Sequence, residues 1–97
     1  MLSLDEARQR AEAVLLVMEV PGVPLMLSEK WEPIHRSWCY GFYWNSRAYF
    51  ETGDLDWFVA GNGPIVVPLD GGEPFVLPTY DQPDTLLDEY EKKHGLM

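Results

Sequence analysis

Residues 38–44 read WCYGFYW, and this stretch decides the fold class. Large apolar side chains recur at every second position, which is the period of a β-strand. The alternation predicts a single strand with two different faces. One face carries Trp38, Tyr40, Phe42 and Trp44, and the other carries Cys39, Gly41 and Tyr43. Because both faces are largely apolar, we expect this strand to lie in the centre of a sheet.

An amphipathic helix precedes the aromatic strand. Ser3 and Glu6 have the spacing of a capping box, which marks the start of a helix. The apolar residues that follow recur at spacings of three and four, on one helical face: Leu4, Ala7, Ala11, Val14, Leu15 and Met18. Pro21-Gly22 ends the helix. Residues 25–27 predict a short strand, whereas residues 28–36 are mixed in character and predict no regular element.

Turn-forming residues divide the chain after the aromatic strand. Asn45-Ser46 predicts a turn, and residues 47–51 predict the returning strand. Residues 55–60 are a short apolar stretch, either a strand or a single helical turn. A tight turn follows, in which glycine reaches positive φ at little cost and proline stiffens the exit. Its residues are Gly61, Asn62, Gly63 and Pro64.

The chain closes with a hairpin and a helix. Residues 65–67 and 75–77 predict two strands joined by a turn at Asp70-Gly71-Gly72. Residues 83–93 have helical spacing, and Gly95 is a natural residue to follow a helix. Together these elements predict a single α+β domain over residues 1–97. It has an N-terminal helix, an antiparallel sheet of about four to five strands and a short C-terminal helix, with the helices packed on one face of the sheet.

The chain is acidic, and its charge is uneven. Its 97 residues carry a net charge of -9, and residues 49–97 hold ten acidic against two basic side chains. Such a field repels phosphate backbones and anionic lipid, and it attracts basic surfaces. We therefore expect another protein as the partner, one with a basic surface, and neither nucleic acid nor membrane. The alternative is that the acidic residues only keep the protein soluble.

The sequence is typical of a cytoplasmic protein. Residues 1–10 are polar and mixed in charge, without a signal-peptide pattern, and the longest apolar run, residues 13–18, is too short to span a bilayer. Cys39 is the only cysteine, so no internal disulfide can form. An edge strand of so small a sheet could pair across a homodimer, although nothing in the sequence requires it.

No set of residues predicts catalysis, a metal or a cofactor. Cys39 and His35 are four residues apart, which on an extended strand separates a nucleophile from its base by about 13 Å. The two histidines and the cysteine form no zinc pattern. Glu51, Asp54 and Asp56 are close together, but their spacing is not that of a calcium-binding EF-hand loop. The glycine-rich turn lacks the third glycine and the lysine that phosphate-binding loops use.

Four tryptophans are many for a chain of this length. Trp38 and Trp44 belong to the aromatic strand, and we expect them in the core. Trp31 and Trp57 lie in irregular stretches beside charged residues, a combination that is common at protein interfaces. We predict a partner-binding surface made of acidic and aromatic residues in turns: Trp31, Glu51, Asp54, Asp56, Trp57 and Glu73. The alternative is that each is an ordinary solvated loop residue.

Three segments resemble a known family in their order and spacing. Residues 44–54 are an aromatic strand that ends in an N-S-x-x-Y turn, residues 61–67 read GNGPIVV, and Asp70-Gly71 lies in the next turn. This series resembles the immunity protein 35 family, also called the YrhB-like domain, over nearly the whole chain. Residues 28–36 depart from the family pattern, and so do the prolines that flank the hairpin, Pro68 and Pro74.

The resemblance implies a small bacterial α+β protein that neutralises a toxin. Many members are encoded beside polymorphic toxins and are predicted to block the cognate toxin by binding it, which needs no catalysis. One branch has been associated with chaperone-like behaviour. Two alternatives stay open: a chaperone-like or general interaction protein of the same fold, and a small-molecule binder or enzyme with a pocket lined by Tyr40, Tyr43 and Trp44.

Overall fold

The structure is a computed structural model that describes residues 1–19, 21–59 and 63–96. In chain order its elements are α1 (Leu4–Met18), β1 (Leu25–Leu27), β2 (Ile34–Arg36), β3 (Cys39–Phe42), β4 (Trp44–Ser46), α2 (Arg47–Thr52), the 3-10 helix η1 (Leu55–Trp57), β5 (Ile65–Pro68), β6 (Phe75–Val76) and α3 (Pro83–His94). The predicted α+β fold is confirmed, and so are both terminal helices. The capping box is formed, because Ser3 and Glu6 each accept a hydrogen bond from the other's backbone N–H.

The described strands form two antiparallel sheets rather than one. β1 pairs with β4, while β2, β3, β5 and β6 form a four-stranded sheet in that order. The prediction of one sheet is wrong because the aromatic stretch is not one strand. Tyr43 separates β3 from β4, and the two parts pair with different neighbours. β2 lies in the segment for which the sequence predicted no element, and it pairs with β3 across the turn Ser37-Trp38.

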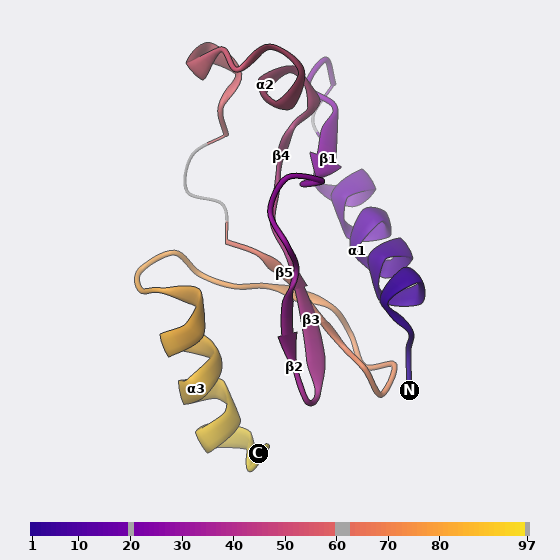
Figure 1. Ribbon diagram of the computed structural model, residues 1–97, viewed down its shortest axis with the longest axis vertical. Helices are drawn as coiled ribbons and strands as arrows, with labels where there is room; N and C mark the ends of the chain where they lie inside the picture. The colour runs from indigo at the N-terminus through magenta and orange to yellow at the C-terminus, as the bar shows by residue number, and fades with distance from the viewer. Residues whose placement is uncertain (20, 60–62, 97) are drawn as a thin grey trace.

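The two long helices lie on opposite faces of the four-stranded sheet (Figure 1). One core cluster joins α1 to the sheet through Ala7, Ala11, Leu15, Phe42, Ile65 and Val67. A second cluster joins α3 to the other face through Cys39, Val66, Leu77, Leu86 and Leu87. Successive side chains of a strand point to opposite faces, and those at residues 65–67 are all apolar and buried. Each face therefore needs a cover, and the prediction that both helices pack on one face is wrong.

Trp38 does not share a face with the other aromatic residues of the stretch. It lies in the turn ahead of β3, so the alternation along that strand does not extend to it. Its ring stacks on Tyr90 of α3 with the ring centroids 5.0 Å apart, and its Nε1–H donates to Glu91 at 2.9 Å. Phe42 and Trp44 instead belong to the cluster under α1.

The segment after the aromatic stretch is a helix and not a returning strand. Asn45 and Ser46 are buried in β4 instead of forming a turn. Ser46 is also the N-cap of α2, because its hydroxyl accepts the N–H of Tyr49 at 3.1 Å. Turns and N-caps favour the same residue types, so a serine at this place is compatible with either. In residues 55–60, the helical-turn alternative is confirmed by η1.

Gly63 and Pro64 of the predicted tight turn are buried just before β5, while Gly61 and Asn62 lie outside the described residues. Gly63 does not have a positive φ. A Cβ at this position would instead overlap the carbonyl oxygen of Leu77, so the residue permits a close backbone approach. The predicted hairpin of β5 and β6 is confirmed, with Gly71 at φ 89° in its turn.

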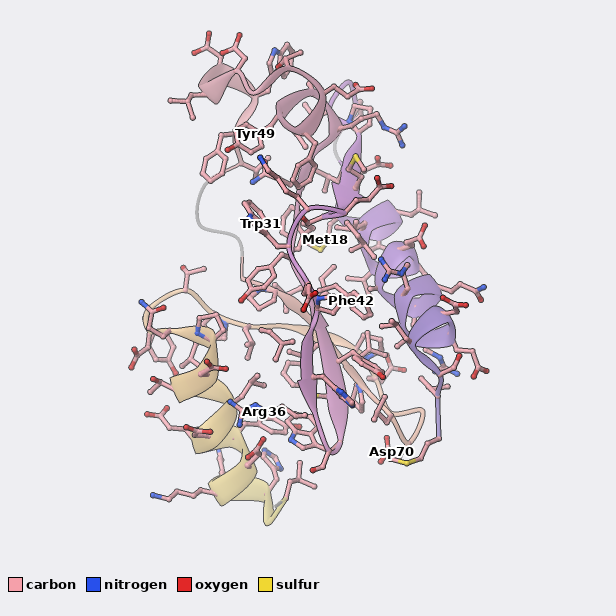
Figure 2. All side chains as sticks on the ribbon, in the orientation of Figure 1. Met18, Trp31, Arg36, Phe42, Tyr49 and Asp70 are labelled. Atoms are coloured by element: carbon pink, nitrogen blue, oxygen red, sulfur yellow. The ribbon has the colours of Figure 1, made fainter. Side chains whose placement is uncertain are left out.

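Arg36 fastens α3 to the edge of the four-stranded sheet (Figure 2). Its guanidinium donates to Asp88 at 2.8 Å, to Glu91 at 3.1 Å and to Asp84 at 3.2 Å. The hydrogen bond with Asp88 raises the pKa of Arg36, which keeps the side chain charged. The Arg36 side chain is only 21% exposed, but Asp84 and Asp88 are largely exposed, so only the pair with Glu91 is partly shielded from solvent.

Candidate partner-binding surface

The molecule consists of two regions that differ in how they are built. The sandwich is the four-stranded sheet with α1 and α3, and the cap is the β1–β4 ribbon with α2 and η1. The cap lies at one end of the long axis (Figure 1), away from Asp70 in the β5–β6 turn (Figure 2). β4 follows β3 after one residue and α2 follows β4 directly, so β4 positions the whole cap on the sandwich.

Three consecutive side chains of β4 hold a later part of the chain by its backbone. Asn45 accepts the N–H of Val59 at 2.9 Å and donates to the carbonyl oxygen of Val59 at 3.3 Å. The Ser46 hydroxyl donates to the carbonyl oxygen of Trp57, and Nε1–H of Trp44 donates to that of Gly63 at 2.8 Å. All three side chains are buried, where an unmade hydrogen bond is costly. We call Trp44, Asn45 and Ser46 the β4 clamp.

Trp31 is positioned by a turn that begins at the buried Ser28. The Ser28 hydroxyl accepts the N–H groups of Lys30 at 3.1 Å and of Trp31 at 3.0 Å. The Trp31 ring then meets Tyr43 and Phe50 edge to face, with centroid distances of 6.1 and 6.0 Å. Edge-to-face pairs of aromatic rings are favourable, so the Trp31 ring is held on both sides although it lies at the surface.

Phe58 brings a further ring to the same side of the cap. The β4 clamp binds the backbone of the residues before and after it, and its ring lies 4.9 Å from that of Tyr49 in T-shaped geometry. Figure 2 shows Tyr49 and Trp31 on the flank of the molecule that faces away from α1. Phe58 is 43% exposed, and Trp31 and Trp57 are each 45% exposed. The cap therefore presents large aromatic side chains to solvent.

The structure brings five of the six predicted partner-binding residues to the cap and its edge: Trp31, Glu51, Asp54, Asp56 and Trp57. The three carboxylates are exposed. Asp54 also has a structural role, because it caps η1 by accepting the N–H of Asp56 at 2.9 Å.

Glu73 is not part of this group. It is exposed in the connection between β5 and β6, and Asp70 of the same connection lies toward the other end of the molecule (Figure 2). There it lines a hollow of about 440 Å³ together with Trp38, Asp70 and Tyr90. The sequence identifies Glu73 as an acidic turn residue but does not indicate toward which end of the sheet the turn points.

Sequence reasoning missed Phe58 as a surface residue and Asn45 as the residue that orders it, and it named Tyr43 and Trp44, with Tyr40, only as lining a small-molecule pocket. Tyr43, Trp44 and Phe58 line a hollow of about 180 Å³ beside Trp31. A signal for Phe58 was available, since it follows Trp57 directly and a single short turn rarely buries two adjacent large rings. For Asn45 no local signal distinguishes a buried clamp residue from a turn residue.

The only cysteine is not placed for nucleophilic chemistry. Cys39 is buried, and burial raises the pKa of its thiol to about 12, so the reactive thiolate is scarce at neutral pH. The ring of His35 stacks on Tyr40 with centroids 4.5 Å apart. In the part of the chain that the structure describes, no group of three or more His, Cys, Asp or Glu side chains could hold a metal ion. Over residues 1–19, 21–59 and 63–96, no helix has both the length and the apolar character to cross a bilayer.

The fold and the cap define a small acidic α+β domain whose exposed aromatic side chains are fixed by hydrogen bonds to the backbone. The family model for immunity protein 35 matches residues 5–93, and the chain belongs to this family. The resemblance found in the sequence is thereby confirmed. No curated protein and no solved structure matches the chain. Membership implies, in general terms, a toxin-neutralising role and a protein toxin as the partner.

Proposed function

We propose that this protein neutralises a cognate bacterial toxin by binding it directly and covering its active site. The observation that carries the proposal is the family match over residues 5–93. Inhibition by occlusion needs a stable surface and no catalytic group. We further propose that the protein acts in the cytoplasm, where reducing conditions suit a chain with a single thiol.

We propose the cap as the surface that contacts the toxin. Trp31 and Trp57 would act as aromatic anchors, because tryptophan is enriched among the residues that dominate binding energy. Glu51, Asp54 and Asp56 would add a negative rim. The net charge of -9 supports a toxin with a basic surface, since opposite charges speed association. Glu73 lies outside this surface and is proposed to take no part.

Co-expression with a candidate toxin from the same genome tests the proposal. Cells that carry the toxin and the wild-type protein should grow, and cells with the toxin alone should die. The double variant Trp31→Ala/Trp57→Ala should lose protection, because truncation of one anchor costs about 2 kcal/mol, or roughly 30-fold in affinity. Glu73→Ala is the matched control and should protect like the wild type. Equal death with and without the wild-type protein would show that the proposed function is wrong.

A chaperone-like role is the second candidate, and the exposed apolar side chains of the cap favour it. Leu55, Trp57 and Phe58 are consecutive or nearly so and are all exposed. Exposed apolar surface of this kind can hold unfolded chains. The measurement is light scattering from a chemically denatured client protein diluted into buffer. A chaperone-like protein lowers the scattering, and a Trp57→Ala/Phe58→Ala variant lowers it less; unchanged scattering with the wild type excludes the role.

A further inference from the structure

An aromatic pocket lies where the cap meets the sandwich. Four rings line it, those of Trp31, Tyr43, Trp44 and Phe58, and Asn45, Gly63 and Pro64 complete the wall. Trp44 is only 6% exposed and is the most deeply set of these rings, whereas Trp31 and Phe58 are nearly half exposed at the rim. The hollow measures about 180 Å³. A hollow of this size holds several waters and admits one side chain.

The walls of the pocket are fixed without help from a partner. Trp44 donates to the carbonyl oxygen of Gly63, Asn45 binds both backbone groups of Val59, and the Ser28 turn orients Trp31. Tyr43 is held against Trp31 by their edge-to-face contact. A preformed site avoids the cost of ordering side chains when a ligand enters.

The charge around the pocket is negative. Residues 29–32 and 51–58, which carry Trp31 and Phe58, include five carboxylates and one basic side chain, Lys30, and of these carboxylates Glu29 lines a separate hollow beside α1. On the α3 side, Asp84 lies close enough to act on the Tyr43 hydroxyl: burial is the main cause that raises the pKa of Tyr43, and the charge of Asp84 adds to it. A cation that enters between the rings therefore lies beside acidic segments of the chain, although Asp84 is already paired with Arg36.

We propose that the aromatic pocket binds a single arginine side chain that projects from the partner protein. The guanidinium would stack on the ring faces, where aromatic quadrupoles attract cations, and the surrounding carboxylates would steer it inward. Arginine suits the pocket better than lysine, because its planar group is weakly hydrated and stacks on aromatic rings. The same fold already holds such a contact elsewhere, with the Arg8 guanidinium 5.6 Å from the centre of the Phe42 ring.

The identity of the partner as a toxin rests on the proposed function. Binding of arginine to the pocket can be tested without a toxin. The probe is the peptide acetyl-Gly-Arg-Gly-amide, titrated into the ¹⁵N-labelled protein and followed through the indole N–H signals. Citrulline replaces arginine in a matched peptide of nearly the same shape and no charge. We expect the arginine peptide to shift the Trp31 and Trp44 signals with millimolar affinity and the citrulline peptide to bind at least five-fold more weakly, as expected for loss of about 1 kcal/mol of cation–π energy.

The chain offers a closely matched pair of variants. Trp31 and Trp57 have the same exposed fraction, 45%, but only Trp31 lines the pocket. Trp31→Leu should weaken the arginine peptide at least five-fold, and Trp57→Leu should leave its affinity unchanged. Added salt should also weaken binding, since part of the attraction comes from carboxylates.

The outcomes separate this inference from the proposed function. Equal binding of the citrulline peptide, equal effects of the two tryptophan variants, or shifts that map away from Trp31 and Trp44 would overturn the arginine pocket. Tighter binding of acetyl-Gly-Lys-Gly-amide would overturn the choice of arginine. If the arginine peptide binds as expected and the protein still fails to protect cells from the candidate toxin, the pocket stands and the toxin-neutralising function falls.

Discussion

The sandwich buries the apolar side chains of its central strand β5, whereas the cap leaves large aromatic side chains exposed. Ile65, Val66 and Val67 are fully buried between α1 and α3. In the cap, Trp57 and Phe58 face solvent although the β4 clamp fixes the backbone around them. Burial of side chains orders the first region, and hydrogen bonds from buried side chains to backbone order the second. A short segment can therefore be well placed without its own side chains being covered.

The largest expected effect concerns the sandwich, where Leu87 of α3 is fully buried. Leu87→Ala removes most of a core side chain and should lower the free energy of unfolding by about 3 kcal/mol. Urea denaturation followed by circular dichroism measures the change. Leu16→Ala, on an exposed position of α1, is the control and should change it by less than about 0.5 kcal/mol. If both variants have equal effects, burial between the sheet and α3 does not stabilise the sandwich.

The next effect tests whether the cap can loosen while the sandwich stays folded. Asn45→Ala removes three hydrogen bonds to the backbone, a buried one at Ser46 and two part-buried ones at Val59, and should cost about 2 kcal/mol. Hydrogen exchange should show lost protection at the Val59 amide, while the amides at 66 and 67 keep theirs. Glu51→Gln, an exposed change in the same region, should alter neither. Uniform loss of protection across the chain would mean that the two regions open as one unit.

A smaller effect is expected at the edge of the sandwich, where Arg36 holds α3. Arg36→Met keeps much of the aliphatic stem but removes the ion pairs with Asp84, Asp88 and Glu91, and should lower stability by about 1 kcal/mol. The loss should shrink in 1 M salt, because salt screens the pairs in the wild type. Arg10→Met, which removes only a hydrogen bond to the Gly71 carbonyl, is the control. A loss that does not depend on salt would point to packing instead.

The smallest effect is a pH dependence at the start of α1. Hydrogen bonds from the backbone N–H and the hydroxyl of Ser3 lower the pKa of Glu6 below its ordinary value of 4.5. The stabilisation that Glu6 contributes is complete above that value and is lost as the pH falls through the lower folded pKa. Wild-type stability should therefore fall more steeply below pH 4.5 than that of Glu6→Gln, as measured by urea denaturation at several pH values. If the stability of the two proteins depends on pH in the same way, the Glu6 carboxylate makes no pH-dependent contribution to stability.

Elements whose ends are marked by characteristic residue types could be predicted from the sequence. Ser3 and Glu6 mark the start of α1, and Gly95 follows α3 at φ 67°. The β5–β6 hairpin was equally evident, because its turn glycines lie between two apolar runs. These signals are local, so they need no knowledge of which distant segment packs against them.

Pairing between distant segments could not be predicted in the same way. The alternation of residues 38–44 continues without a break, yet Phe42 pairs with Ile65 while Trp44 pairs with Leu27. Only these distant partners divide the stretch into β3 and β4. β2 was missed for the same reason, since its pairing with β3 outweighs the mixed composition of residues 28–36.

The candidate surface was predictable as far as local composition allows. Trp31 and Trp57 stand among charged residues, and both are half exposed. Their neighbours in the pocket, Tyr43 and Phe58, come together only through the β4 clamp and the break between β3 and β4. Glu73 was grouped with them because a turn in the sequence does not reveal the end of the sheet on which it lies.

The β4 clamp bears on how such a protein can change over evolution. Its bonds go to backbone atoms at residues 57, 59 and 63, and backbone atoms are nearly the same whichever side chain a residue carries. The exposed side chains at 57 and 58 can therefore be exchanged while the clamp that places them is kept. If the proposed partner changes, the exposed residues can be substituted one at a time without loss of the fold that positions them.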